Sequence, residues 1–239
     1  MKKPAASKQL IDDLVAGSRI LARHGVLDAY GHVSARSDKR PGHFLMSRSR
    51  APALVTAADL MELGPDSEPA AGDKRKGFIE RYIHGEIYRA RPEVMAVVHS
   101  HSTSVIPFGV TRTKLRPVSH MGGFLWSGAP VWDIRKVREE NDLLVRDRPL
   151  GLSLANTLGS CACVLMRGHG MTVVGGSIPE AVFRAVYTEM NARVQLQCML
   201  LEGPIEFLSD HEARAIDAAN RGTLERPWEL WKKDIYLKA

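Results

Sequence analysis

The chain of 239 residues has few cysteines, few aromatic residues and no long hydrophobic run. Its three cysteines, Cys161, Cys163 and Cys198, are odd in number and lack framework spacing, which favours reduced thiols and a cytoplasmic location. The N-terminal segment MKKPAASKQLIDDL has no apolar stretch, so a signal peptide is not expected. No apolar run approaches the roughly 20 residues that span a bilayer, so no membrane partner is expected either.

The positive charge of the chain also lacks a pattern. The formal net charge is +6, but the basic residues are scattered apart from a short run at Lys74, Arg75 and Lys76. Without a basic stripe or interleaved aromatic residues, nucleic-acid binding is not expected. A positive field favours attraction of a small anion. A chain of this length buries a core without a structural metal, so a metal here would be catalytic.

Helical and strand periodicities alternate along the first hundred residues. Apolar residues at helical spacing predict a first helix that ends near Gly25. The segments GHVSAR and HFLMS, on either side of a turn-rich stretch, predict a β-hairpin. Residues 76–90 return to the helical period, and the β-branched segment VMAVVHSHS that follows predicts a buried strand.

The second half of the chain begins less regularly. Residues 107–160 alternate glycine, proline and charge, which predicts loops around short elements and a helix near 135–146. The segment CACVLMRGHGMTVVG predicts a second hairpin. Ser177-Ile-Pro-Glu180 has capping-box spacing and predicts the start of a long helix.

The chain shows no internal repeat and no low-complexity linker, so residues 1–239 are interpreted as a single domain. The C-terminal tail, residues 221–239, contains Trp228 and Trp231. Two tryptophans near a terminus predict that this tail docks on the body of the domain or on a neighbouring subunit.

Three histidines and one glutamate form a candidate metal site. His99 and His101 are two residues apart on a predicted strand, so their side chains point to the same face. His169 lies between two glycines, which allow a tight turn to approach another element. Glu80 lies in the first part of the predicted helix before the strand. This donor set suits zinc, manganese, iron or cobalt, with open positions for substrate.

Each of these residues also has a simpler interpretation. A histidine pair two residues apart arises by chance in many chains with nine histidines. His169 could be an ordinary turn residue, and Glu80 could face solvent and pair with His84 one turn on.

The stretch from Glu80 through HGEIYRARPEVMAVVHSHS, followed by RGHG, resembles the class II aldolase/adducin family. The resemblance extends from about residue 8 to about residue 205. It implies a single-domain α/β/α layered fold with a central, mainly antiparallel sheet. It also implies one divalent metal per subunit, zinc favoured, on Glu80, His99, His101 and His169. Members of the family usually form homotetramers with this site near a subunit interface.

The sequence departs from the sugar-phosphate aldolases of this family where they bind phosphate. Their G-N-x-S motif is replaced by Gly31-His32-Val33-Ser34, and their glycine-containing turn by Met46-Ser47-Arg48-Ser49-Arg50. Phe78 and Ile79 replace a pair of serines before Glu80. These changes indicate that the phosphate site is absent, so the anionic group of the substrate is expected to be a carboxylate.

A narrower branch of the family shares GHVS, FLMSRS, APALVT, HSHS, VIPFG, MRGHG and RPWELW with this chain. The resemblance implies a decarboxylase of aromatic catabolism. Its substrate would be a hydroxylated aromatic carboxylate such as a dihydroxyphthalate, or a ring-cleavage product such as 2-hydroxy-3-carboxymuconic semialdehyde.

Four residues are interpreted as the carboxylate-binding group, with a guanidinium suited to bidentate pairing. They are Ser34, Ser47, Arg48 and Ser49. His120, near the position of the aldolase proton-donor tyrosine, or His32 would return a proton to the carbanion. Glu80 would be a ligand first and a proton shuttle second. Arg48 could instead be a surface arginine, and His120 a structural hydrogen-bonding residue.

Loss of CO2 next to a carbonyl or enol leaves a carbanion that delocalises as an enolate, which a metal stabilises. Retro-aldol cleavage forms the same kind of enolate, so an aldolase acting on a non-phosphorylated hydroxy-keto acid is an alternative. A non-haem iron oxygenase and a non-catalytic, adducin-like interaction domain are two others.

Overall fold

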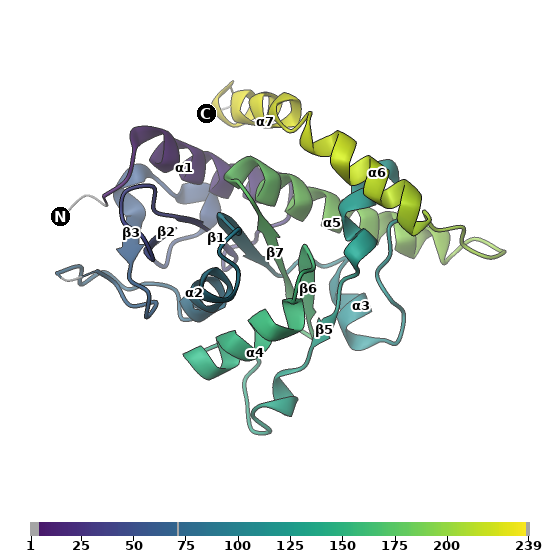
Figure 1. Ribbon diagram of the computed structural model, residues 1–239, viewed down its shortest axis with the longest axis horizontal. Helices are drawn as coiled ribbons and strands as arrows, with labels where there is room; N and C mark the ends of the chain where they lie inside the picture. Colours follow the sequence, from purple (N-terminus) through teal and green to yellow (C-terminus); the bar gives the residue numbers. More distant parts are fainter. Residues whose placement is uncertain (1–4, 71, 238–239) are drawn as a thin grey trace.

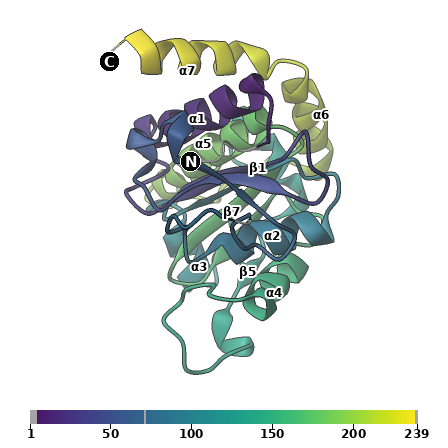
Figure 2. The same cartoon turned by 90° about the vertical axis from the view of Figure 1, so that its left-hand side faces the viewer.

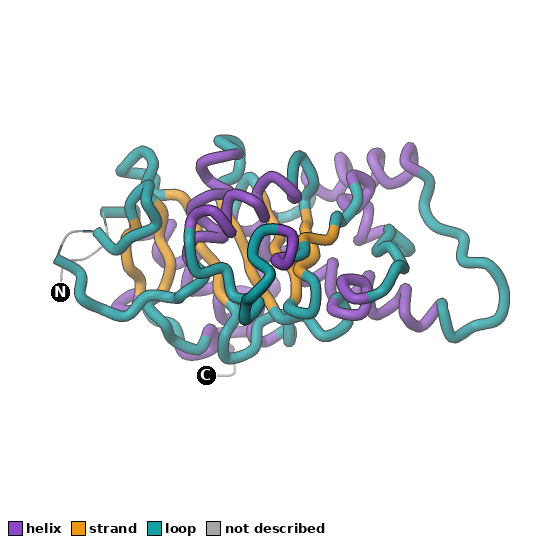
Figure 3. Tube along the Cα trace, turned by 90° about the horizontal axis from the view of Figure 1, so that it is seen from below, coloured by secondary structure: helices purple, strands orange, loops and turns teal. Residues whose placement is uncertain are grey.

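A seven-stranded sheet forms the centre of the protein (Figure 1), whose computed structural model describes residues 5–70 and 72–237. The strands lie side by side (Figure 3). Their order is β3-β2-β1-β4-β7-β6-β5, and all neighbours are antiparallel except β5 and β6. The strands are β1 His32–Arg36, β2 Phe44–Ser47, β3 Leu60–Leu63, β4 Ala96–Ser100, β5 Val131–Trp132, β6 Cys163–Met166 and β7 Gly170–Gly175.

Helices cover both faces of this sheet. In Figure 2, α1 and α5 lie on one face with α7 beyond them, and α2 and α4 lie on the other. Each face has its own buried apolar cluster. The helices are α1 Lys8–Arg23, α2 Arg81–Ala90, α3 Ile106–Val110, α4 Arg148–Leu158, α5 Ile178–Cys198, α6 Asp210–Arg221 and α7 Glu225–Leu237. Short 3-10 turns are η1 Pro52–Leu54, η2 Ala57–Asp59, η3 His120–Ser127 and η4 Ile134–Lys136. The predicted α/β/α architecture with a mainly antiparallel sheet is confirmed.

The helix predicted over residues 76–90 begins later than expected, at Arg81. Residues 76 and 77 pair with another segment instead, because Gly77 bridges to Arg48 and the Lys76 carbonyl accepts the Ser49 amide, and a turn at residues 79–80 follows. Glu80 is therefore the N-cap residue of α2 rather than part of its first turn.

The helix predicted near 135–146 is wrong, since only the three-residue turn η4 forms there. Leu143 has a φ of 67°, a left-handed conformation that no α-helix accommodates. Two backbone groups of this segment bond to the metal-site cluster described below: the Val145 amide donates to Glu80, and the Leu143 carbonyl accepts from His169.

The C-terminal helix α7 packs on the body of this chain. Trp231 contacts His24 at a ring-centroid distance of 4.9 Å, and Lys232 pairs with Asp13 of α1 at 2.9 Å. Both Trp228 and Trp231 are buried. The single domain predicted over 1–239 and the tail over 221–239 include residues 1–4, 71 and 238–239, which lie outside the described residues. Within the described part, no helix is long and apolar enough to cross a membrane.

Candidate active site and metal centre

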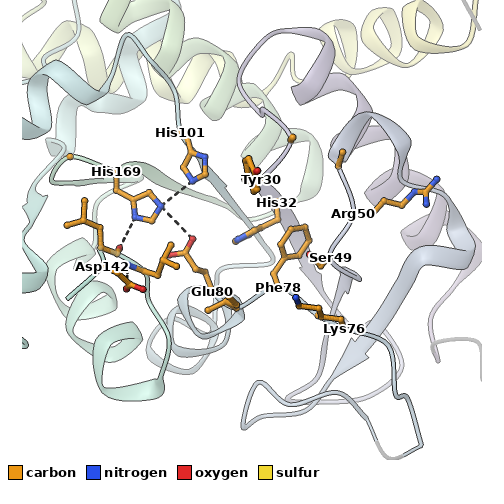
Figure 4. Close-up of a pocket in the computed structure, with 17 residues that line it drawn as sticks. Tyr30, His32, Ser49, Arg50, Lys76, Phe78, Glu80, His101, Asp142 and His169 are labelled. Atoms are coloured by element: carbon orange, nitrogen blue, oxygen red, sulfur yellow. Dashed lines mark hydrogen bonds and ion pairs between the residues drawn. The ribbon is translucent and has the colours of Figure 1, made fainter. Parts of the chain in front are cut away.

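Glu80, His99, His101 and His169 meet at one end of the sheet, and Figure 4 shows all of them but His99. Each offers one ligand atom, and the four atoms all lie within 4.8 Å of one another. Glu80 Oε2 is 3.4 Å from His99 Nε2 and 3.6 Å from His169 Nε2. The Nε2 atoms of His101 and His169 are 3.1 Å apart. Three segments distant in sequence thus contribute to one cluster, here called the metal-site cluster.

The turn between β6 and β7 carries His169 to this cluster. Gly168 has a φ of 67°, which favours glycine. At Gly170 a Cβ atom would overlap the Ser100 carbonyl oxygen, so only glycine lets the turn lie against the end of β4. This close approach places His169 beside His99, in the last part of β4, and beside His101, which follows β4.

The three histidines share one arrangement, in which Nδ1 contacts an oxygen and Nε2 faces the other members of the cluster. The oxygens are the Met171 carbonyl at 3.1 Å for His99, the Asp28 carboxylate at 3.0 Å for His101 and the Leu143 carbonyl at 2.9 Å for His169. Because these oxygens only accept hydrogen bonds, each Nδ1 carries the ring proton. Each Nε2 therefore directs a lone pair into the cluster.

This convergence of lone pairs fits a divalent cation. Among the described residues, His99 Nε2 is buried without a hydrogen-bond partner. A buried acceptor without a partner is costly unless a donor or a metal satisfies it. Histidines oriented by carbonyl or carboxylate oxygens at the outer nitrogen are typical of metal ligands. Three imidazoles and one carboxylate suit zinc, manganese, iron or cobalt.

The ionisation states within the cluster agree with this role. Burial, followed by the neighbouring His99, lowers the pKa of His169 to about 4, so this ring is neutral at pH 7. Burial alone would raise the pKa of Glu80, but the surrounding imidazoles bring it well below its ordinary value. A neutral imidazole and an ionised carboxylate are the forms that bind metals.

A cavity of about 690 Å³ opens beside the cluster. In Figure 4 Glu80, His101 and His169 lie at one end of it, and Arg50 and Lys76 lie towards the other. The described residues lining the wall are Ala29, Tyr30, His32, Ser49, Arg50, Ala51, Lys76, Gly77, Phe78, Ile79, Glu80, His101, Asp142, Leu143, Leu144, Gly168 and His169. An apolar and aromatic wall with a metal cluster at one end and cations at the other suits a small anion with an apolar body.

Of the two histidines predicted to transfer protons, His32 lines this cavity and His120 does not. The buried His32 ring lies 4.5 Å from the ring of Phe78 and 5.0 Å from that of His99. His120 is exposed at the start of η3, which packs on α6, and its carbonyl accepts a hydrogen bond from Asn220. A catalytic role for His120 would therefore require the cavity of another subunit.

The predicted carboxylate-binding residues are mostly turned away from the cavity. Arg48 pairs with Asp59 at 2.7 Å, and neither Ser34 nor the buried Ser47 lines the wall. Ser49 does. Asp59, the capping carboxylate of η2, is shared by Arg48, Thr56 and, at 3.3 Å, Arg50.

The cations at the cavity wall, Arg50 and Lys76, were not predicted, and neither were Asp28 and the Leu143 carbonyl that orient the histidines. Arg50 belongs to the segment 46–50 discussed above. Alternate residues of an extended segment point to opposite sides, so considering each side in turn could have identified it. The Leu143 carbonyl could not be predicted, because every residue has a backbone carbonyl and the sequence does not show which one meets His169.

Residues 12–196 match the family described as the Class II Aldolase and Adducin N-terminal domain. The chain belongs to this family. The match covers all four residues of the cluster and most of the chain, and it agrees with the layered fold.

Two relatives of this class II aldolase/adducin chain are named as decarboxylases. Decarboxylase tropJ of Talaromyces stipitatus is 43% identical over 244 residues, which cover 92% of each chain. The 3,4-dihydroxyphthalate decarboxylase of a Terrabacter species is 35% identical, over 97% of this chain and 96% of the relative. The family and these relatives place the chain in the decarboxylase branch and support a lyase.

A solved structure shows the same fold. The aldolase II superfamily protein from Pseudomonas syringae superposes with a TM-score of 0.80 over 97% of this chain and 93% of its own, at 19% identity. At this identity the likeness concerns the fold alone.

Proposed function

We propose that this chain is a metal-dependent decarboxylase of a hydroxylated aromatic carboxylate or of its ring-cleavage product. The observation that carries the proposal is the convergence of three Nε2 lone pairs and the Glu80 carboxylate at the end of a cavity with an apolar wall. The names of two relatives that align over nearly the whole chain support a carboxy-lyase.

In this proposal Glu80, His99, His101 and His169 hold one divalent metal per subunit, zinc favoured, with manganese, iron or cobalt as alternatives. When bound there, the metal supplies Lewis-acid stabilisation of the charge that develops on a substrate oxygen as CO2 leaves. Asp28, the Met171 carbonyl and the Leu143 carbonyl keep the three imidazoles oriented for this role.

The walls of the cavity orient the substrate. Phe78 and Ile79 stand where the sugar-phosphate aldolases have serines, so an aromatic or unsaturated carbon skeleton packs against them. Arg50 and Lys76, on the side away from the cluster, attract a carboxylate that is not lost in the reaction. Ser49 lies between them and adds a hydroxyl donor. The apolar part of this wall favours an anion with an aromatic or unsaturated skeleton over a sugar.

His32 is the histidine that this chain itself places at the cavity. It lies between Phe78 and the metal-site cluster (Figure 4), where it would contact the reacting part of a substrate. Glu80 is first a ligand and second a group that can accept a proton. His120 enters the proposal only in a homo-oligomer such as the tetramer typical of the family, with the site near a subunit interface. A cytoplasmic location is part of the same proposal.

The test is an assay of purified protein with 3,4-dihydroxyphthalate and with a 2-hydroxy-3-carboxymuconate, measuring CO2 and product together. The proposal expects one CO2 per substrate consumed, without oxygen uptake. Release of an aldehyde without CO2 would favour an aldolase, and oxygen consumption would favour an oxygenase. Absence of turnover with a full complement of metal would favour an adducin-like interaction domain.

A further inference from the structure

A chain of buried polar groups leads from the cavity into the core beneath it. His32 Nδ1 is 2.7 Å from His84 Nε2, and His84 Nδ1 is 2.6 Å from Ser34 Oγ. Ser34 Oγ is in turn 2.7 Å from the hydroxyl of Tyr88. All four side chains are buried, and Ser34 and His84 have no exposed surface. In this hydrogen-bonded series of four residues, His32 Nε2 is the end atom on the cavity side, and it bonds to no other member of the series.

The protons of this chain can be arranged in only two directions. Each of the three hydrogen bonds holds one proton between its two atoms, so the four side chains must all donate in the same sense along the series. A neutral imidazole donates through one nitrogen and accepts through the other. Fixing the donor at one end of the chain therefore fixes every ring proton along it.

The closed end of the chain decides between the two directions. Among the described residues, Ser34 is the one side chain that hydrogen bonds to the Tyr88 hydroxyl, and the Val97 amide also approaches this oxygen as a donor. If Ser34 donated to Tyr88, the phenol proton would be buried without an acceptor. A buried donor without a partner costs about 1–3 kcal/mol. The opposite direction satisfies every group, so Tyr88 donates to Ser34.

The remaining protons follow from this end. Ser34 has accepted from Tyr88 and must donate to His84 Nδ1, so the proton of His84 is on Nε2. His84 Nε2 then donates to His32 Nδ1, which leaves the proton of His32 on Nε2. This outer nitrogen is the one that His32 presents at the cavity.

We propose that Tyr88, Ser34 and His84 are positioning residues that hold His32 as a neutral Nε2–H tautomer, so that it donates a hydrogen bond to a substrate oxygen. The role rests on the proposed function, in which charge develops on such an oxygen as CO2 leaves. A preorganised N–H aimed at developing charge stabilises the transition state without a proton being transferred.

The assignment also explains why His32 is not a fifth ligand. Its ring lies 5.0 Å from that of His99, close enough to reach the same region. However, a nitrogen that bears a proton has no lone pair for a metal. The sugar-phosphate aldolases have asparagine at the position of His32. The histidine keeps a hydrogen-bond donor at the cavity, and its other nitrogen bonds to the buried His84.

The tautomers can be read directly by nitrogen-15 NMR of histidine-labelled, zinc-loaded protein, with signals assigned through His32→Gln and His84→Gln. Both His32 and His84 are expected to be neutral with the proton on Nε2. Protons on Nδ1 in both rings would overturn the proposal. This result does not depend on turnover, so failure of the decarboxylase assay and failure of the tautomer assignment are distinguishable.

Two substitutions at His84 test the consequence for catalysis. In His84→Gln the amide can still accept from Ser34 and donate to His32, whereas in His84→Glu the carboxylate only accepts and draws the His32 proton to Nδ1. His84→Glu is expected to lower kcat about 100-fold with zinc content retained, while His84→Gln keeps most of the activity.

The matched control for the added carboxylate is His211→Glu, at an exposed position on α6. It should change neither kcat nor the His32 tautomer. Equal losses in His84→Gln and His84→Glu, or an unchanged kcat in a folded, zinc-loaded His84→Glu, would contradict the proposal.

Discussion

His101 and His169 face each other through Nε2 atoms 3.1 Å apart, although neither of these atoms carries a proton. Their ring protons are used on the outer side, where Nδ1 of His101 meets Asp28 and Nδ1 of His169 meets the Leu143 carbonyl. Two facing lone pairs repel unless a cation lies between them and the other ligands. This relationship is the reason for treating the cluster as a metal site rather than a hydrogen-bonded network.

Replacing a ligand should remove the metal. His99→Ala deletes the buried Nε2 and is expected to reduce bound zinc from about one per chain to near zero, as measured by elemental analysis. His211→Ala, at an exposed position on α6, is the matched control and should keep its zinc. Full zinc occupancy in His99→Ala would rule out the assigned ligand set.

Asp28 should influence the metal without touching it. Asp28→Asn removes the charge that orients His101, and loss of such an outer partner typically weakens metal affinity about 10- to 100-fold. Competition with a chelator measures the change. Asp66→Asn, an exposed carboxylate in a distant turn, should leave affinity unchanged. Equal affinities in the two variants would contradict an orienting role.

The cations of the cavity should act on substrate binding. Lys76→Ala and Arg50→Ala are each expected to raise KM for a dicarboxylate by roughly 10-fold with little change in kcat, because they contact the carboxylate that remains. Lys74→Ala, an exposed lysine two residues away that does not line the cavity, is the control. A KM that responds equally to Lys74 and Lys76 would indicate only a general field effect.

The turn that carries His169 should be sensitive at one glycine more than at the other. Gly170→Ala places a methyl group on the Ser100 carbonyl and is expected to lower the unfolding free energy by at least about 2–3 kcal/mol and to reduce zinc content. At Gly168 a Cβ meets nothing closer than 3.7 Å, so Gly168→Ala should cost only about 1–2 kcal/mol of backbone strain. Thermal and denaturant unfolding distinguish these outcomes, and equal losses would show that close approach to β4 is unimportant.

Much of the fold could be predicted from the sequence, because α1 and α2 have strong helical apolar periods, β4 is rich in β-branched residues and α5 begins at a clear N-cap. The segment 135–146 could not, since bonds to the distant Glu80 and His169 help to set its conformation. Local propensity carries no information on such long-range partners.

The site shows the same division. Glu80, His99, His101 and His169 were predictable because their side chains act directly and their spacing is characteristic. Arg48 was chosen over Arg50, since the sequence does not reveal that Arg50 lines the cavity and Arg48 does not, although both guanidinium groups pair with Asp59. The role of His84 was also missed, because it depends on the packing of α2 against β1, which brings His84 to His32 and Ser34.

The most direct test of the central proposal is CO2 release from 3,4-dihydroxyphthalate by the protein before metal removal, after removal, and after titration with zinc, manganese, iron or cobalt. The account predicts that CO2 release disappears with the metal, returns at about one equivalent per chain, and is not restored in His99→Ala. Undiminished CO2 release by metal-free protein, or by His99→Ala, would contradict it.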